Sequence, residues 1–218
     1  MAKGIDLSHW NGNVNWSQVA QDDKNIKFAF AKATEGGTYQ DPKFEENFKG
    51  IKENNVQAGA YHVFRMTSTP DEQITNITNT LTKASFDSNK DKLAISATTG
   101  ICEGERTRKC DNPTNHTNTE RAENLHSLLT KLDKNGYSPI VHASPKTWNS
   151  YYTQKDHDFS KYPLWVADWR DRSEPELPKD WKDAGKDYTY WNYTSQGRVD
   201  GIEGQVPLDQ TNQDVWIS

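Results

Sequence analysis

The sequence lacks the apolar material that a membrane protein needs. Hydrophobic residues make up 33% of the 218 residues, and no stretch approaches the roughly 20 apolar residues of a membrane span. The opening stretch, MAKGIDLSHW, also lacks the apolar core of a signal peptide. We therefore expect no membrane insertion. We expect an extracellular destination, reached after removal of a signal peptide or by release from a lysed host, as phage products are.

The sequence also lacks an excess of positive charge. The formal net charge is -5 and no long basic run occurs, which argues against nucleic acid as a partner. Aromatic residues, in contrast, are plentiful, with 8 Trp, 9 Tyr and 7 Phe. This content excludes a disordered chain, because disordered segments have few aromatics. Aromatic faces beside mixed polar groups suit sugar rings, so carbohydrate is the favoured class of ligand.

Cysteine is limited to two residues, Cys102 and Cys110, which flank the polar stretch EGERTRK. This spacing makes them a candidate disulfide that would pin the intervening loop, and a disulfide would imply an oxidising destination. Two cysteines with no histidine close by make only half a zinc ligand set. We therefore predict no metal site and no cofactor.

Strand and helix signals alternate over the first two thirds of the chain. The segment 41–55 is the clearest helix, with Asp41 as a natural N-cap and Pro42 at the first helical position. A second helix is predicted to begin with a capping box at Thr69. The strands expected in this part are 3–10, 26–34, 56–64, 92–98 and 137–144, and further helices are expected at 119–135 and 145–152.

The last third reads differently. Three strand-like segments, 162–169, 187–195 and 205–210, are separated only by loops. About five β/α units followed by three strands predict an α/β fold, an irregular TIM-like β/α barrel. No linker or internal repeat interrupts the pattern. We therefore expect a single domain over residues 1–218.

Several blocks of the sequence occur together in one known family. They are GIDLSHWNG, FAFAKATEG, GAYHVF, PIVHASPKTW, LWVADW and YWNYTSQGRVDGIEGQVPLD, and they run from Gly4 to about Asp209. In content, order and spacing they resemble glycoside hydrolase family 25, the lysozymes of the phage and bacterial muramidase type. The resemblance implies an irregular barrel that cleaves the β-1,4 bond between N-acetylmuramic acid and N-acetylglucosamine in peptidoglycan. It also implies a monomer whose partner is a cell-wall or other N-acetylhexosamine glycan.

The resemblance further implies where catalytic acids should stand. The family carries an Asp on the first strand, an Asp-x-Glu pair on the fourth, whose Glu is the proposed general acid, and an Asp in a V-D-x-N-like block near the end. Asp6 takes the first of these places. Ser96 and Thr98 stand at the Asp-x-Glu positions. Pro207 stands at the last Asp, and Asp209 replaces the Asn.

These substitutions have a direct chemical meaning. Residues two apart on a strand share a face, so Ser96 and Thr98 keep the geometry of the acid pair but remove its charge. Glycosidic cleavage needs a proton for the leaving oxygen and negative charge near the oxocarbenium-like centre. General acid catalysis alone is worth ~10²–10⁴-fold. We therefore predict a catalytically impaired or inactive pseudoenzyme that keeps a glycan-binding groove.

Two alternatives remain open. Glu103 and Glu105 lie just after the strand at 92–98 and could serve as relocated acids of an active muramidase or N-acetylhexosaminidase. The barrel could also be an interaction scaffold that binds no sugar.

The matching blocks also supply candidates for the walls of the groove. Lys32 and Glu35 lie in such blocks, although an internal ion pair at a strand end would explain them as well. Trp169 and Tyr190 match aromatic positions of the family too, and we expect some of the aromatics to be core. His142 stands where the family often has Tyr, and it is either a sugar contact or an ordinary half-buried histidine. The predicted substrate-binding residues are Tyr61, His62, Trp165, Asp168 and Trp191.

Overall fold

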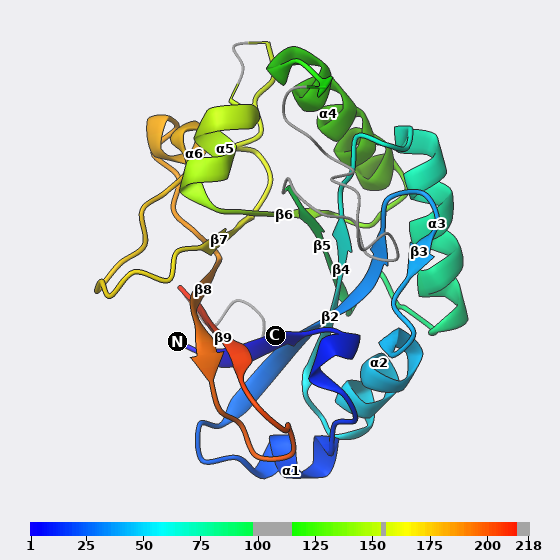
Figure 1. Ribbon diagram of the computed structural model, residues 1–218, viewed down its shortest axis with the longest axis vertical. Helices are drawn as coiled ribbons and strands as arrows, with labels where there is room; N and C mark the ends of the chain where they lie inside the picture. The colour runs from blue at the N-terminus through cyan, green and yellow to red at the C-terminus, as the bar shows by residue number, and fades with distance from the viewer. Residues whose placement is uncertain (98–114, 154–155, 213–218) are drawn as a thin grey trace.

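The computed structural model describes residues 1–97, 115–153 and 156–212 of the chain. Its strands form a sheet in the order β1-β9-β8-β7-β6-β5-β4-β2-β3, and an additional pairing of β1 with β2 closes the sheet into a barrel (Figure 1). Strand β3 lies outside the ring at the edge of β2. The strands are β1 Lys3–Leu7, β2 Ile26–Glu35, β3 Tyr39–Gln40, β4 Gln57–Val63, β5 Lys92–Ser96, β6 Ile140–Ala143, β7 Leu164–Ala167, β8 Tyr190–Gly197 and β9 Val206–Thr211.

The barrel is parallel from β1 through β2, β4, β5, β6 and β7 to β8, whereas β9 runs antiparallel to both of its neighbours. Helices lie around most of the ring, but none covers the outside of β8 and β9 in Figure 1. The predicted β/α barrel with a helix-poor last third is therefore confirmed. The helices are η1 His9–Asn11, α1 Trp16–Gln21, α2 Phe44–Glu53, α3 Pro70–Lys83, α4 Asn118–Lys134, α5 Pro145–Tyr151 and α6 Lys179–Asp183.

The local signals for α3 and α2 had different outcomes. The capping box of α3 is present, since Glu72 N donates to Thr69 Oγ1 at 3.2 Å and Thr69 N donates to Glu72 Oε2 at 3.1 Å. Helix α2 begins at Phe44, two residues later than predicted, and Lys43 rather than Asp41 stands at its N-cap position. Asp41 Oδ1 still accepts from the backbone N of Lys43 at 2.8 Å in the turn before the helix. Asp41 Oδ2 accepts from the backbone N of His9 at 3.0 Å, which joins the end of β1 to the segment before α2.

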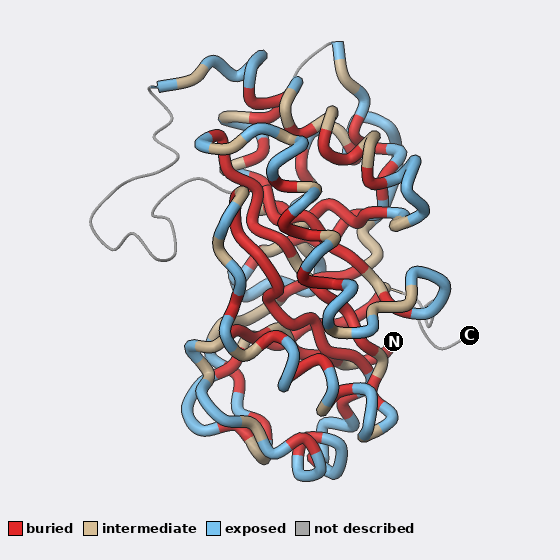
Figure 2. Tube along the Cα trace, turned by 90° about the vertical axis from the view of Figure 1, so that its right-hand side faces the viewer, coloured by how far each residue is buried: buried red, intermediate tan, exposed pale blue. Residues whose placement is uncertain are grey.

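Large side chains fill the interior of the barrel. Two glycines make room for them: a Cβ on Gly4 would lie 2.4 Å from the Phe28 ring, and one on Gly59 would lie 2.5 Å from the Phe30 ring. A larger core lies between the strands and the helices, and Figure 2 shows the buried segments running through the middle of the molecule. Within the described part of the chain, no helix combines the length and apolar character needed to cross a membrane. The interior cluster consists of Ala2, Phe28, Phe30, Ala94, Ile140, Trp165 and Tyr190.

Candidate functional site

Strand register places a set of polar side chains inside the barrel, toward the carboxyl ends of its parallel strands. Residues paired across neighbouring strands point to the same face of the sheet. Asp6 pairs with Phe30, an interior residue, and Ser96 pairs with His142, which in turn pairs with the interior Trp165. In barrel enzymes this end of the strands carries the active site. We call it the mouth.

The β5–β6 side of the mouth is electrically neutral in the described residues. Ser96 is only 8% exposed, and its Oγ lies 3.1 Å from Nδ1 of His142. The His142 ring packs on Trp165, with 4.0 Å between ring centroids. Burial lowers the pKa of His142 to about 4, so the imidazole is uncharged near neutral pH. A hydroxyl and a neutral imidazole therefore occupy the place where the family resemblance would put a carboxylate.

The β1–β8–β9 side of the mouth is acidic. Asn192 donates from Nδ2 to Asp6 Oδ2 at 3.0 Å and to Asp209 Oδ1 at 3.1 Å, so one amide bridges two carboxyl groups. Trp165 Nε1 also donates to Asp209 Oδ1, at 2.8 Å. Asp209 is fully buried, whereas Asp6 is partly exposed. We call Asp6 and Asp209 the acid pair.

The acid pair holds a proton at neutral pH. Burial raises the pKa of Asp6 to about 6, and a hydrogen bond with the Asp209 side chain partly offsets that rise. Burial and the adjacent Asp6 charge raise the pKa of Asp209 well above its ordinary value. Two carboxyl groups in one buried site cannot both ionise cheaply, so one proton is shared between them.

Two other acids near the mouth are neutralised by cations. Glu35 accepts from Lys32 at 3.0 Å and from Arg65 at 3.4 Å, with all three side chains buried. The Lys32–Glu35 ion pair was one of the two interpretations of those residues, and it is confirmed. These charges hold the ends of β2 and β4 together.

Asp168 is held by an arginine. Burial opposes its ionisation, but hydrogen bonds from the Arg170 guanidinium and the backbone N of Glu176 outweigh that effect and lower the pKa of Asp168 to about 2. Arg170 Nε lies 2.8 Å from Asp168 Oδ1. Asp168 is therefore a permanent anion with a fixed partner, not a proton donor.

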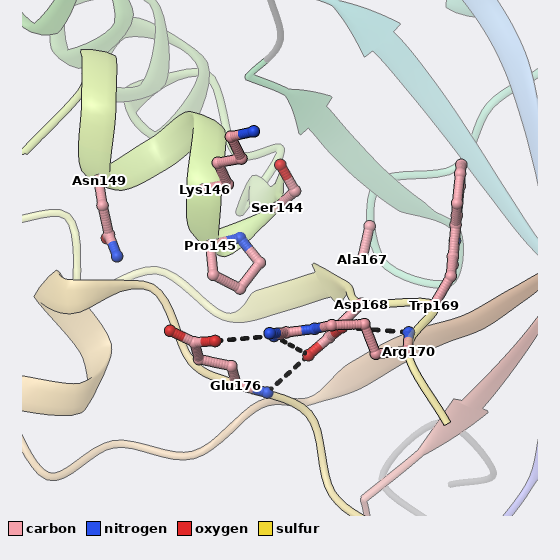
Figure 3. Close-up of a pocket in the computed structure, with 9 residues that line it drawn as sticks. All are labelled: Ser144, Pro145, Lys146, Asn149, Ala167, Asp168, Trp169, Arg170 and Glu176. Carbon is pink, nitrogen blue, oxygen red and sulfur yellow. Dashed lines mark hydrogen bonds and ion pairs between the residues drawn. The ribbon is translucent and has the colours of Figure 1, made fainter. Parts of the chain in front are cut away.

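A pocket of about 640 Å³ opens at the rim, between the start of α5 and the segment after β7 (Figure 3). Trp169, 60% exposed, forms one wall. Arg170 lies along another side, fixed by Asp168 and by Glu176, whose Oε2 is 2.7 Å from Arg170 Nη2. Trp169 Nε1 donates to Asn192 Oδ1, which ties this wall to the acid pair. The lining residues are Ser144, Pro145, Lys146, Asn149, Ala167, Asp168, Trp169, Arg170 and Glu176.

The aromatic residues predicted to bind substrate differ in position. Tyr61 is partly exposed and packs edge-on against Trp165, with 6.1 Å between ring centroids. Trp165 and Trp191 are only 1% and 5% exposed, so they build the walls of the barrel rather than offer open faces. The open indole of the rim pocket is that of Trp169, which matches a family position but is absent from the predicted substrate-binding residues.

His62 lies away from any surface that a sugar reaches. It is fully buried, with Nδ1 2.7 Å from Thr34 Oγ1 and Nε2 2.8 Å from Gln73 Oε1. Burial lowers its pKa to about 4. These contacts fix α3 to β2 and β4, so His62 has a packing role and is not among the proposed glycan contacts.

Several predicted residues lie outside the described part of the chain: Thr98, Cys102, Glu103, Glu105 and Cys110. Their roles as a lost acid position, relocated acids and a disulfide stay predictions. Pro207 is described. It lies on β9, two residues before Asp209, and is partly exposed.

In the described residues, the acid pair cannot act as two separate catalytic groups. Glycosidases place their two carboxyl groups roughly 5 to 9.5 Å apart, on either side of the scissile bond. Asp6 and Asp209 are hydrogen-bonded to each other and share Asn192, so they behave as one group.

A closed β/α barrel with a polar mouth and an aromatic rim is the architecture of many sugar-cleaving enzymes. The family model "Glycosyl hydrolases family 25" matches residues 5–202, and the chain belongs to this family.

Two of the relatives that the chain matches are lysozymes. The chain is 26% identical over 215 residues to Lysozyme M1 of Streptomyces globisporus, an alignment that covers 96% of this chain and 67% of the relative. It is 25% identical over 216 residues to the autolytic lysozyme of Clostridium acetobutylicum, which covers 99% of this chain and 57% of the relative. Among solved structures, the bacterial lysozyme from Streptomyces coelicolor matches with a TM-score of 0.77 and 25% identity, covering 98% of this chain and 93% of that chain.

Proposed function

We propose that this chain binds an N-acetylhexosamine glycan of the peptidoglycan type across the barrel mouth and hydrolyses it poorly or not at all. Three features support a retained groove. They are the open Trp169 face, the rim pocket beside it, and the partly exposed Asp6 and Tyr61 inside the mouth. An extracellular or phage-released protein would meet such a glycan in bacterial cell walls.

One observation carries the hydrolytic half of the proposal. Ser96 on β5 has a neutral partner, His142, at 3.1 Å, and no described carboxyl group contacts it. A hydroxyl beside an uncharged imidazole cannot protonate a leaving sugar oxygen near neutral pH, because its own pKa is far too high. Glu35 is enclosed in ion pairs with Lys32 and Arg65, and the Arg170 guanidinium keeps Asp168 ionised, so neither acid is placed to act as the general acid.

The proposal is tested by separating binding from cleavage. The purified chain is incubated with bacterial cell walls beside an active family 25 lysozyme, and turbidity and new reducing ends are followed. Binding of a β-1,4-linked N-acetylglucosamine tetramer is measured by calorimetry. We expect binding of the tetramer with clearing at least 100-fold slower than for the active enzyme, since the general acid alone is worth about that much.

Two outcomes would overturn this proposal. Clearing at the pace of the active enzyme, abolished by Glu103→Gln or Glu105→Gln, would establish relocated acids and a working muramidase. Failure to bind the tetramer or intact glycan strands at any pH would instead favour a scaffold that binds no sugar.

A further inference from the structure

The two carboxyl groups of the acid pair have unequal surroundings. Asp209 Oδ1 accepts from both Trp165 Nε1 and Asn192 Nδ2, at 2.8 and 3.1 Å. Asp209 Oδ2 is buried, and no donor group of the described residues reaches it. A buried carboxylate oxygen without a donor is costly, whereas a protonated oxygen is itself a donor and needs only an acceptor. The Asp6 side chain is that acceptor, so the shared proton belongs on Asp209.

Asp6 is the half of the acid pair that faces the mouth. It is partly exposed, while Asp209 is completely enclosed, so only Asp6 can meet a ligand. One of its oxygens, Oδ2, accepts from Asn192. With the proton on Asp209, Asp6 is an anion, and an anionic oxygen forms a stronger hydrogen bond with a sugar hydroxyl or acetamido N–H than a neutral one does.

The titratable groups around the acid pair do not neutralise it. On β2, Lys32 is bound to Glu35 at 3.0 Å, and on β6 the buried His142 is uncharged above about pH 4. On β8, burial raises the pKa of both Tyr190 and Tyr193, so these phenols stay neutral. No ion pair between either acid and a cation occurs in the described residues. The charge on Asp6 therefore depends on the pH of the solution and on Asp209.

Asn192 connects this charge to the rim. Its Nδ2 donates to both acids, and its Oδ1 accepts from Trp169 Nε1, so a single amide contacts the acid pair and the open indole at once. The Asn192 side chain is fixed from both ends and is itself buried. The charged floor and the aromatic wall of the groove thus form one hydrogen-bonded unit.

From these contacts we infer that Asp6 is the anionic glycan contact of the mouth, and that Asp209 is the positioning residue which keeps Asp6 anionic by holding the shared proton. Mild acid then weakens glycan binding by adding a second proton to the acid pair. This inference rests on the proposed function, since it names the charged contact and the pH regulation of the same groove. It also gives Asp209 a role that is absent where the family has Asn.

The size of the effect follows from the titration of Asp6. With a pKa of about 6, Asp6 is about nine-tenths protonated at pH 5 and almost fully ionised at pH 7.5. If only the ionised form binds well, affinity for the glycan falls by the fraction that is competent. Binding should therefore be about tenfold weaker at pH 5 than at pH 7.5.

The experiment measures binding of the β-1,4-linked N-acetylglucosamine tetramer by calorimetry from pH 5 to pH 8, for the wild type and for two variants at one position. Asp209→Asn keeps a donor beside Asp6, so the midpoint of the pH dependence of binding should stay within about half a pH unit of the wild-type value. Asp209→Leu is similar in size but cannot donate, so the midpoint should move at least one unit toward alkaline pH. Thermal melts of all three confirm that each variant is folded.

A second readout does not depend on the sugar. The indole N–H resonance of Trp165, which donates to Asp209, should titrate with a midpoint near pH 6 in the free protein. An affinity for the tetramer that does not change from pH 5 to pH 8 would overturn the inference. Equal midpoints of the pH dependence of binding in Asp209→Asn and Asp209→Leu would also overturn it. An indole signal that titrates while no tetramer binds at any pH would instead show that the proposed function is at fault.

Discussion

The two sides of the barrel mouth provide partners for their buried polar groups in different ways. On the β5–β6 side, the polar groups of Ser96 and His142 satisfy each other without any charge. On the β1–β8–β9 side, Asp6 and Asp209 are kept together by a shared proton and by Asn192. The Ser96–His142 contact needs no carboxylate. The second side needs its carboxyl groups, because its amide and indole donors point at acceptors.

Trp165 is the boundary between these two sides. One face of its ring packs on His142, with centroids 4.0 Å apart, and its N–H donates to Asp209 at 2.8 Å. The indole is 1% exposed, so it separates the sides without being open to ligand. The comparison teaches that one barrel mouth can place a neutral polar pair and a proton-sharing acid pair on opposite sides of a single buried indole.

The largest expected effect comes from returning charge to the neutral side. In the double variant Ser96→Asp with Thr98→Glu, the strand regains the Asp-x-Glu spacing of the family. We expect cell-wall clearing to rise at least 100-fold over the parent chain, because a general acid contributes ~10²–10⁴-fold. Turbidity and release of reducing ends measure it.

The matched control for this gain is Ser96→Asn with Thr98→Gln, which adds the same bulk without ionisable groups. Similar clearing by the two double variants would show that charge at these positions is not what the parent lacks. It would also remove the contrast between the two sides of the mouth.

The second effect is on stability, because the acid pair, unlike the neutral Ser96–His142 pair, makes the free energy of unfolding depend on pH. The folded chain retains protons on the acid pair that unfolded Asp residues release near pH 4, so these groups make the free energy of unfolding fall as pH rises. In Asp209→Asn one of the two protons is gone. The decline between pH 5 and pH 8 should therefore become shallower by ~1.4 kcal/mol per pH unit. Urea denaturation at several pH values measures this slope.

Asp168→Asn is the control for that slope. The pKa of Asp168 is lowered to about 2, so its carboxylate is ionised in both folded and unfolded chains above pH 5. Its loss should lower stability by a similar amount at every pH in the range and leave the slope unchanged. An unchanged slope in Asp209→Asn would mean that the acid pair carries no extra proton.

The smallest effect concerns the rim. Removing the exposed ring in Trp169→Ala should weaken binding of the tetramer about fivefold, since aromatic contacts of this kind contribute ~1 kcal/mol. Trp10 is slightly more exposed, at 66%, but it follows β1 and does not line the rim pocket, so Trp10→Ala should bind within about a factor of two of the parent. Equal losses in the two variants would argue against a groove at Trp169.

Much of the fold could be predicted because its signals are local. Apolar runs gave the strands, and the capping box at Thr69 marked the start of α3. Asp41 contacts the turn before α2 through Oδ1, as its sequence position suggests, but its Oδ2 also has a distant partner, the backbone N of His9, which lies 32 positions earlier in the chain. A capping signal describes its neighbours in sequence and contains no information on such a contact.

The site could be predicted only in part. The prediction that Ser96 stands at an acid position rests on the family blocks, but the role proposed for Asp209 could not be reached in that way, since the resemblance indicates only a replaced Asn. Strand alternation could have found it: on β9 Asp209 pairs with Asn192 of β8 and with Gly4 of β1, which shares a face with Asp6. The sequence could not show which tryptophan side chain is exposed to solvent, because that exposure depends on where β7 ends.

The pairing of β1 with β9 has a practical consequence for experiments with this barrel. Lys3 lies opposite Gln210, and Thr211 N donates to the carbonyl oxygen of Ala2 at 2.9 Å, so the first strand begins where the last one finishes. That meeting point lies at the end of the barrel opposite the mouth, because β1 runs toward the mouth and β9 away from it. Met1 itself lines a surface pocket together with Trp169 and Arg170, so a fluorescent label attached at residue 1 would lie beside these rim residues.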